Sequence, residues 1–269
     1  MTTVRQPAIF IPHGGGPCFW MESPPPFGPR AWDGLRDHLA GLVASLPERP
    51  KAFVVVTAHW EEAQPTVSTA AAPGMLYDYY GFPAHTYQLK YPAPGAPAIA
   101  AEVKRLIANA GLKVGEDAER GFDHGVFVPF LIIDPAAQIP VAMLSLQRDL
   151  DPALHLAVGK ALAPLRDQGI AIVGSGMSFH DLRRFRDGDG RASQIFDAWL
   201  DETLTKNDPT AREQRLVHWS EAPAARACHP REEHLLPLMV VAGAADGAPG
   251  AHSFREAIGG KTISAFRFG

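Results

Sequence analysis

Five of the 11 histidines in this chain stand where side chains from distant parts of a sequence can converge: His13, His59, His124, His180 and His234. Two follow apolar, strand-like runs at 8–12 and 52–58, and another comes a short turn after a similar run at 170–176. The remaining two lie in a turn and at the beginning of a helical stretch. Neutral imidazole is a common transition-metal ligand, and three protein ligands with an open position are typical of a catalytic site. We therefore expect these histidines to include the ligands of a catalytic metal ion.

The elements that must position these histidines alternate between strand and helix. Apolar and β-branched runs predict strands at 7–12, 51–60, 139–146, 170–176 and 261–268. Helical spacing of apolar residues predicts helices at 32–46, 97–111, 150–169, 191–204, around 209–219, and at 231–245. The strand–helix–strand order at the start of the chain favours parallel pairing. Ligands of open α/β sheets bind beyond the carboxyl ends of the strands, which is where several of the histidines fall.

Two segments are less regular. Residues 61–94 are rich in Gly, Pro and Tyr, and we expect a loop and hairpin region that includes a strand at 86–91. Residues 121–133 are expected to form a turn that leads into an apolar segment. We find no internal repeat and no clear linker. The sequence thus predicts a single α/β domain over residues 1–269, with a central mixed, largely parallel sheet flanked by helices and a loop-rich active-site layer.

The composition is that of a globular protein, and it indicates neither a nucleic-acid nor a membrane partner. The chain is 46% hydrophobic and carries a net charge of −4, with Lys and Arg spread along its length. Its apolar runs have the length of strands, and its N-terminus lacks the pattern of a secretory signal. With two cysteines, Cys18 and Cys228, no disulfide framework is indicated, and we expect a cytoplasmic protein. The sequence does not distinguish a monomer from a homo-oligomer.

Other motifs predict weaker alternatives. The glycines at 14–16 could cradle a phosphate, but no Gly-Lys-Ser/Thr follows them and no G-x-G-x-x-G is completed. The stretch 174–178 is similar to a nucleophile turn, yet its order is not G-x-S-x-G. Nothing marks Cys18 as a reactive thiolate. His85 stays unassigned, and the other histidines are expected to be structural: His38, His155, His218, His229 and His252.

Seven short motifs occur in order along the chain: IPHGGGP (11–17), VVVTAHW (54–60), YYGFP (79–83), YPAPG (91–95), GFDHG (121–125), GSGMSFHDLR (174–183) and EEHLLPL (232–238). As a set they resemble the class III extradiol dioxygenases of the LigB-like superfamily, and within these the DOPA 4,5-dioxygenase branch. The resemblance covers most of the chain. It implies a non-haem Fe(II) enzyme that uses O₂ to cleave the ring of a small catechol, DOPA-like or another catecholic acid, next to its hydroxyls.

The resemblance also implies a set of metal ligands. His13 and His59 match the two histidine ligands of the family. In the wider class the third ligand is a glutamate, which gives two histidines and a carboxylate on one face of the metal. In the DOPA branch the histidine of the Glu-His pair is expected at the metal. His234 is therefore the expected third ligand, and Glu233 is the alternative.

Two further histidines match pocket residues of the family. His180 matches its acid/base histidine, and a group that titrates near neutral pH suits the removal and return of catechol protons. His124 matches a second pocket histidine, which is expected to hydrogen-bond the substrate or oxygen. Asp123 and Asp181 either form turns and caps or fix imidazole tautomers. Four aromatic residues either line the pocket or pack the loop: Tyr77, Tyr79, Tyr80 and Phe82.

The identity of the metal leaves a second function open. Three neutral histidine ligands suit Zn²⁺ as well as Fe²⁺. The alternative is therefore a zinc-dependent hydrolase or another metalloenzyme on the same scaffold. A third reading is a binding protein with a vestigial metal pocket, but such a protein would need neither His124 nor His180.

Overall fold

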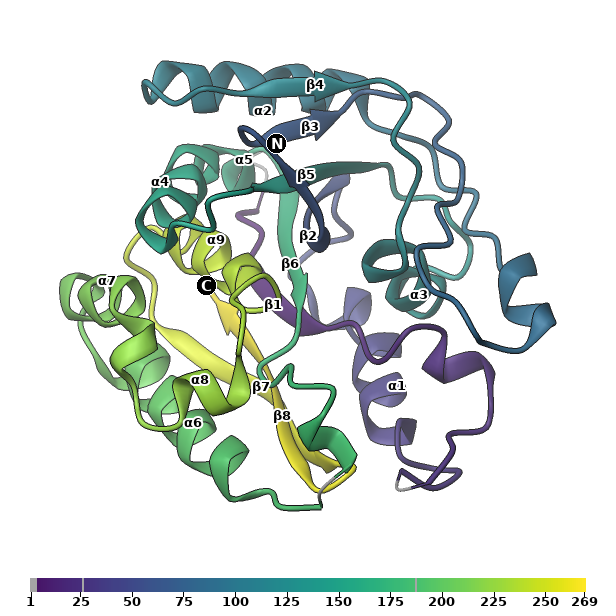
Figure 1. The fold of residues 1–269 in the computed structure, drawn as a ribbon. Helices are drawn as coiled ribbons and strands as arrows, with labels where there is room; N and C mark the ends of the chain where they lie inside the picture. The colour runs from purple at the N-terminus through teal and green to yellow at the C-terminus, as the bar shows by residue number, and fades with distance from the viewer. Residues whose placement is uncertain (1–3, 26, 187) are drawn as a thin grey trace.

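The computed structural model describes residues 4–25, 27–186 and 188–269, and within them the chain folds around one eight-stranded sheet (Figure 1). The strands lie in the order β4-β3-β5-β2-β6-β1-β8-β7. Their bounds are β1 Ala8–Pro12, β2 Ala52–Glu62, β3 Thr66–Ser68, β4 Gly115–Asp117, β5 Val141–Gln147, β6 Ile170–Gly176, β7 Gly250–Ile258 and β8 Lys261–Phe268. The four central strands β5, β2, β6 and β1 are parallel, whereas β3 and β8 pair antiparallel with the strands at the borders of this group. The mixed, largely parallel α/β sheet that the sequence predicts is confirmed.

The centre of the sheet is apolar on both faces. The valines at 54–56 in β2 are fully buried, and so are most residues of β5 and β6 beside it. Parallel strands that helices cover on both faces have continuous apolar runs rather than alternating ones. Because these four strands are parallel, their carboxyl ends lie together at one edge of the sheet.

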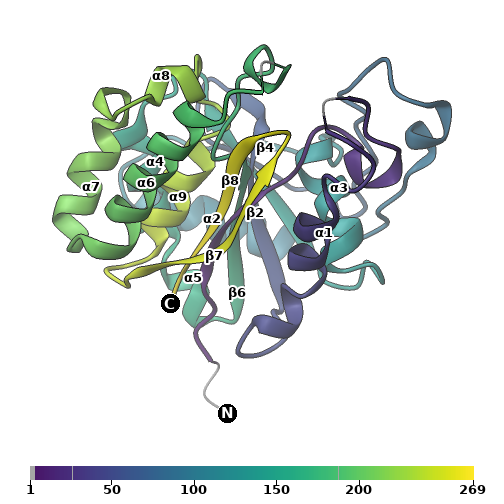
Figure 2. The same ribbon diagram turned by 90° about the horizontal axis from the view of Figure 1, so that it is seen from below.

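Helices cover the two faces of the sheet (Figure 2). One face packs against α2 (Pro97–Asn109), α4 (Pro152–Leu162) and α9 (Leu236–Ala244), and the other against α1 (Asp33–Ala40) and α3 (His124–Ile133). The remaining α-helices are α5 Pro164–Asp167, α6 Arg191–Asp201, α7 Pro209–Val217 and α8 Ala225–Cys228. Helix α9 is buried all round, as its wholly apolar sequence requires. In the described part of the chain, no helix has the length and apolar character needed to cross a membrane.

The predicted strand at 86–91 is wrong. Residues Ala84–Gln88 form a 3₁₀ helix instead. The Thr86 hydroxyl donates to Pro83 O at 2.8 Å, and the Tyr79 hydroxyl donates to Thr86 O at 2.7 Å. The alternating pattern of this segment is typical of a strand, but these local side-chain hydrogen bonds hold the backbone in a turn.

The other departures from the predicted elements are short or lie at a sheet edge. Helix α3 occupies the stretch where we expect a turn and an apolar segment, although Pro129 lies inside it. Strands β3 and β4 have three residues each, too few to show a pattern. Strand β7 is an edge strand, and most of its residues are exposed or partly exposed, so it lacks the apolar run of the central strands.

Candidate metal centre

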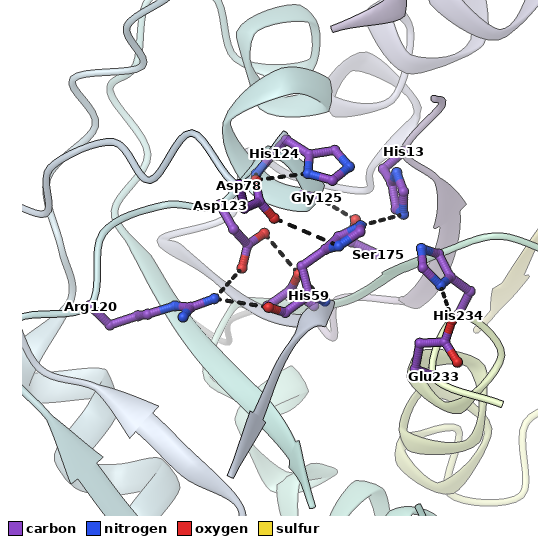
Figure 3. Close-up of polar contacts among 11 residues, drawn as sticks. His13, His59, Asp78, Arg120, Asp123, His124, Gly125, Ser175, Glu233 and His234 are labelled. Atoms are coloured by element: carbon purple, nitrogen blue, oxygen red, sulfur yellow. Dashed lines mark hydrogen bonds and ion pairs between the residues drawn. The ribbon is translucent and has the colours of Figure 1, made fainter. Parts of the chain in front are cut away.

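All five histidines expected in the site lie beyond the carboxyl edge of the central strands. His13 follows β1, His59 lies near the end of β2, and His180 follows β6. His124 is the first residue of α3, and His234 lies just before α9. Figure 3 shows four of them around one space: His13, His59, His124 and His234. The convergence expected from the predicted elements is thus observed.

Glycines at the end of β6 let the histidine-bearing segments approach each other. A Cβ on Gly176 would collide with His234 O, and a Cβ on Gly174 would collide with the first turn of α9. The backbones here are joined directly, because His13 N donates to Gly176 O at 3.1 Å and Met177 N donates to His234 O at 2.9 Å. Strand β6 therefore sets the spacing between the two histidines on either side of it.

The position of His124 is fixed by a hydrogen bond between α3 and β6. In a regular helix the N–H of residue 129 would donate to Gly125 O, four residues earlier. Pro129 has no N–H group, so this hydrogen bond cannot form. The Ser175 hydroxyl of β6 donates to Gly125 O instead (Figure 3). The proline is thus tolerated inside the helix, and the beginning of α3, with His124, is held at the strand ends.

His13, His59 and His234 form a group whose candidate ligand atoms all lie within 4.8 Å of one another. The Nε2 atoms of His13 and His59 are 3.2 Å apart. Two imidazole nitrogens bound to one ion at about 2.1 Å, with tetrahedral to octahedral angles, lie about 3.0–3.4 Å apart. The observed separation therefore fits two ligands of one metal ion.

His13 and His234 are buried and His59 is mostly buried, and this enclosure decides their charge. Desolvation lowers the pKa of His13, His59 and His234 well below the ordinary value, and the neighbouring histidines lower it further. A neutral imidazole keeps a lone pair for a metal ion, whereas a protonated one does not. The group is therefore ready to bind a cation at neutral pH without first losing protons.

The hydrogen bonds of His234 point to a ligand on its other ring nitrogen. His234 Nδ1 lies 2.9 Å from Glu233 Oε1, and His234 Nε2 is buried without a hydrogen-bond partner among the described residues. A carboxylate beside Nδ1 favours the Nδ1–H tautomer, which leaves the lone pair on Nε2. This donor set fits a metal ion that is held through Nε2.

Glu233 lies behind His234 rather than in the three-histidine group. Its Oε1 is also 3.4 Å from His180 Nδ1, so one carboxylate oxygen faces two imidazoles. Burial opposes the ionisation of Glu233, but a hydrogen bond from His180 and the positive charge of the nearby Arg231 outweigh it and lower the pKa of the carboxyl. Glu233 is thus a negative charge that supports His234 and His180.

Asp78 is a comparable carboxylate on the other side of the site, and it was not among the site residues expected from the sequence. Its Oδ1 lies 2.8 Å from His124 Nδ1, and its Oδ2 lies 3.7 Å from His59 Nδ1 (Figure 3). Asp78 stands in the Tyr-rich loop, where no periodic pattern relates it to the histidines. Its position in YDYYGFP (77–83), beside a motif of the resemblance, is the signal that could have found it.

The other two aspartates hold the backbone and neighbouring side chains. Asp123 is fully buried, accepting from the Thr57 hydroxyl at 2.9 Å and from Arg120 at 3.2 Å. Asp181 accepts from the backbone N–H groups of Arg183 and Arg184. Of the two readings of these aspartates, the contacts favour the structural one.

The aromatic residues of the loop divide between packing and the site. The hydroxyls of Tyr77 and Tyr79 donate to backbone carbonyls of the same loop, and Tyr80 is 91% exposed. Phe82 lies against Gly16, and the Tyr79 ring centroid is 5.8 Å from that of His124. Tyr79 and Phe82 therefore border the site while Tyr77 packs the loop.

A parallel-centred α/β sheet with neutral, buried imidazoles beyond its carboxyl edge is the arrangement of a metal-dependent enzyme. The comparison with known families agrees. Residues 7–266 match the family described as the catalytic LigB subunit of aromatic ring-opening dioxygenase, and the chain belongs to this family. It is a ring-cleaving extradiol dioxygenase, of a family of non-haem metal enzymes.

Named relatives and a solved structure agree with this assignment. Dioxygenase tasH of Hapsidospora irregularis is 41% identical over 255 residues, which cover 89% of this chain and 78% of the relative. The 4,5-DOPA dioxygenase extradiol of Beta vulgaris is 42% identical over 202 residues, 74% of each chain, and that of Escherichia coli is 35% identical over 251 residues, 92% of this chain and 88% of the relative. A crystal structure of an uncharacterized protein from Escherichia coli K12 matches with a TM-score of 0.79 and 31% identity, covering 98% of this chain and 100% of the other.

Proposed function

We propose that this chain cleaves a small catechol with O₂ at a metal ion held by His13, His59 and His234. The observation that carries the proposal is His234 Nε2, which is buried with no hydrogen-bond partner in the described part of the chain, beside the facing Nε2 atoms of the other two histidines. A buried polar atom of this kind is rarely left without a partner in a native protein. A cation on these three nitrogens would satisfy it.

Iron(II) is the metal we propose for activity, and zinc(II) is a second ion that the same ligands suit. When bound, the metal lowers the pKa of the catechol hydroxyls and orients the catechol and O₂ beside each other. The protein supplies the rest of the arrangement. Glu233 and Asp78 hold the Nδ1 sides of His234 and His59, which turns their Nε2 atoms toward the shared space.

His180 and His124 are proposed to handle protons and to position the substrate. The His180 side chain is 22% exposed, against 9% for His124, so His180 is the one that exchanges protons with solvent. We assign to His180 the removal of a proton from a catechol hydroxyl and its later return. His124 is the more enclosed residue, and we assign to it a hydrogen bond to the substrate or to oxygen.

The substrate we propose is a DOPA-like catechol or another catecholic acid. Relatives from Beta vulgaris, Portulaca grandiflora and Escherichia coli carry the name 4,5-DOPA dioxygenase extradiol. Loops set the specificity of such sites, so the name of a relative supports the class of substrate rather than one compound. The reaction would serve the catabolism of aromatic compounds.

The proposal is tested with protein that is freed of metal and then reconstituted anaerobically with Fe(II). A panel of catechols, DOPA among them, is added with O₂, and oxygen uptake is followed together with the yellow ring-cleavage product. We expect both signals from at least one catechol. No product from any member of the panel would refute the proposed activity.

The zinc-loaded protein is the matched comparison for the alternative function. A zinc hydrolase would consume no oxygen and would act on esters or amides in the zinc form. The family favours the dioxygenase, so we expect the zinc form to be inactive toward both catechols and hydrolase substrates. Hydrolysis by the zinc form, without ring cleavage by the iron form, would support the alternative instead.

A further inference from the structure

Asp78 hydrogen-bonds the backbone N–H and the imidazole of His124, and its second oxygen faces the imidazole of His59. Its Oδ1 accepts from His124 N at 2.9 Å and lies 2.8 Å from His124 Nδ1. Its Oδ2 lies 3.7 Å from His59 Nδ1, beyond hydrogen-bond distance, so it acts on His59 through its negative charge, which favours a proton on the nitrogen that faces it. An ionised carboxylate accepts hydrogen bonds and donates none, so an imidazole nitrogen at 2.8 Å must itself carry the proton.

The loop that carries Asp78 is fixed on both sides of this residue. Leu76 N donates to Phe122 O at 2.7 Å, which joins the loop to the segment just before His124. The Tyr77 hydroxyl donates to Leu89 O at 2.6 Å, and the Tyr79 hydroxyl to Thr86 O at 2.7 Å. The hydroxyls of both neighbours of Asp78 are therefore anchored to the loop backbone, and the Asp78 carboxylate supplies the polar contact to the imidazoles.

We infer that Asp78 is a positioning residue that holds both His59 and His124 in the Nδ1–H tautomer. The Nε2 lone pair of His59 is then free for the metal, and the Nε2 of His124 is left as a proton acceptor rather than a donor. The statement about His59 rests on its proposed role as a ligand. The tautomers themselves are properties of the metal-free protein, and they hold whether or not the chain cleaves catechols.

An asparagine cannot replace Asp78 in this role, although it has nearly the same shape. The amide offers one acceptor oxygen and one donor NH₂ group. If the oxygen stays on His124, the NH₂ group faces His59 Nδ1 and favours the tautomer in which the His59 Nε2 is protonated. If the amide turns round, the NH₂ group faces the N–H groups of His124. In Asp78→Asn, one of the two imidazoles therefore no longer has an acceptor oxygen that favours its Nδ1–H tautomer.

The test is the tautomer of each imidazole in ¹⁵N-labelled, metal-free protein, read from long-range ¹H–¹⁵N correlations at about pH 8, where imidazoles are ordinarily neutral. We expect the Nδ1–H form for His59 and His124 in the wild type. In Asp78→Asn at least one of them should change to the Nε2–H form. Zinc affinity, measured by competition with a chelator, should fall about 10–100-fold, as for other residues that orient a ligand from behind.

Asp181→Asn is the matched control, because Asp181 accepts from backbone N–H groups next to His180 and an asparagine oxygen preserves these bonds. Both tautomers and the zinc affinity should remain as in the wild type. The inference is overturned if wild-type His124 is found in the Nε2–H form, or if folded Asp78→Asn keeps both tautomers. If Asp78→Asn does not fold, the wild-type spectrum still decides. Correct tautomers without ring cleavage would refute the proposed function and leave the role of Asp78 standing.

Discussion

The imidazoles of His180 and His234 are stacked, with ring centroids 3.3 Å apart and ring planes inclined by 15°. The Nδ1 atoms of both rings face the same oxygen of Glu233. A proposed metal ligand and the proposed acid/base residue therefore share one carboxylate. His59 and His124 also share a carboxylate, that of Asp78, but each faces a different oxygen of it. Each carboxylate thus couples the orientation of a proposed ligand to that of a histidine that is proposed to face the substrate.

Removing a ligand should remove the metal. We expect His13→Ala, His59→Ala and His234→Ala each to lose bound metal together with activity, because two imidazoles are left to hold an ion that needs three. Metal content by mass spectrometry, after reconstitution and gel filtration, is the measurement. Full metal occupancy in any of the three variants would take that residue out of the ligand set.

Removing His180 should separate metal binding from turnover. His180→Ala is expected to keep its metal and to lose about 10²–10⁴-fold in kcat, the usual contribution of a positioned acid/base group. Metal content and kcat are measured on the same preparation. Loss of the metal would instead make His180 a ligand, and wild-type turnover would show that it transfers no proton in the slow step.

Glu233→Gln tests whether this residue supports a ligand or is one. As a support it should cost about 10–100-fold in metal affinity and leave the metal bound at saturation. Glu232→Gln is the matched control, because Glu232 pairs with the half-exposed Arg226 and such surface pairs contribute little. Failure of Glu233→Gln to bind metal at any concentration, with Glu232→Gln normal, would make Glu233 the third ligand.

The buried His229 should make folding depend on pH. Its pKa is lowered from 6.5 to about 4, chiefly because burial disfavours the charged ring. As the pH falls below 6.5, His229 becomes protonated in the unfolded chain but stays neutral in the folded one. The free energy of unfolding therefore decreases until the pH reaches about 4, where the folded chain also takes up the proton. The shift corresponds to about 3 kcal/mol of unfolding free energy over this window.

The measurement for His229 is urea unfolding of the metal-free wild type and of His229→Gln at several pH values. Glutamine can still donate to Ser178 O, which His229 Nε2 contacts at 3.0 Å. Carboxylates titrate in both proteins, so the difference between their two stability curves is the readout. We expect the wild type to lose more stability than the variant as the pH falls. Parallel curves would contradict the assignment.

The central strands and the histidines at their ends could be predicted because their signals are local. The buried runs of β1, β2, β5 and β6 are continuous and apolar, and a histidine next to such a run must lie at the sheet edge. The closeness of His13 and His59 then follows from the parallel order of the strands, whereas His234, which precedes α9, was expected among the ligands only from the family resemblance. Strand β7 escaped prediction because an edge strand need not be apolar.

The partners of the histidines could not be predicted, because they depend on how loops fold back. Asp78 reaches His124 through a loop that is held by tyrosine hydroxyls and by a backbone bond to the segment before α3. The 3₁₀ turn at Ala84–Gln88, which replaces a predicted strand, belongs to the same loop. Contacts between this loop and the histidines cannot be predicted from spacing along the sequence, because they depend on individual side-chain hydrogen bonds and not on a periodic pattern.

The most direct test of the account is the fate of the two atoms of labelled oxygen. Fe(II)-loaded protein is given a DOPA-like catechol and ¹⁸O₂ in ordinary water, and the ring-opened product is trapped at once and analysed by mass spectrometry. We expect a product that carries both labelled atoms from the wild type, and no such product from His234→Ala. A product without label, or equal labelling from His234→Ala, would contradict a ring-cleaving dioxygenase built on these three histidines.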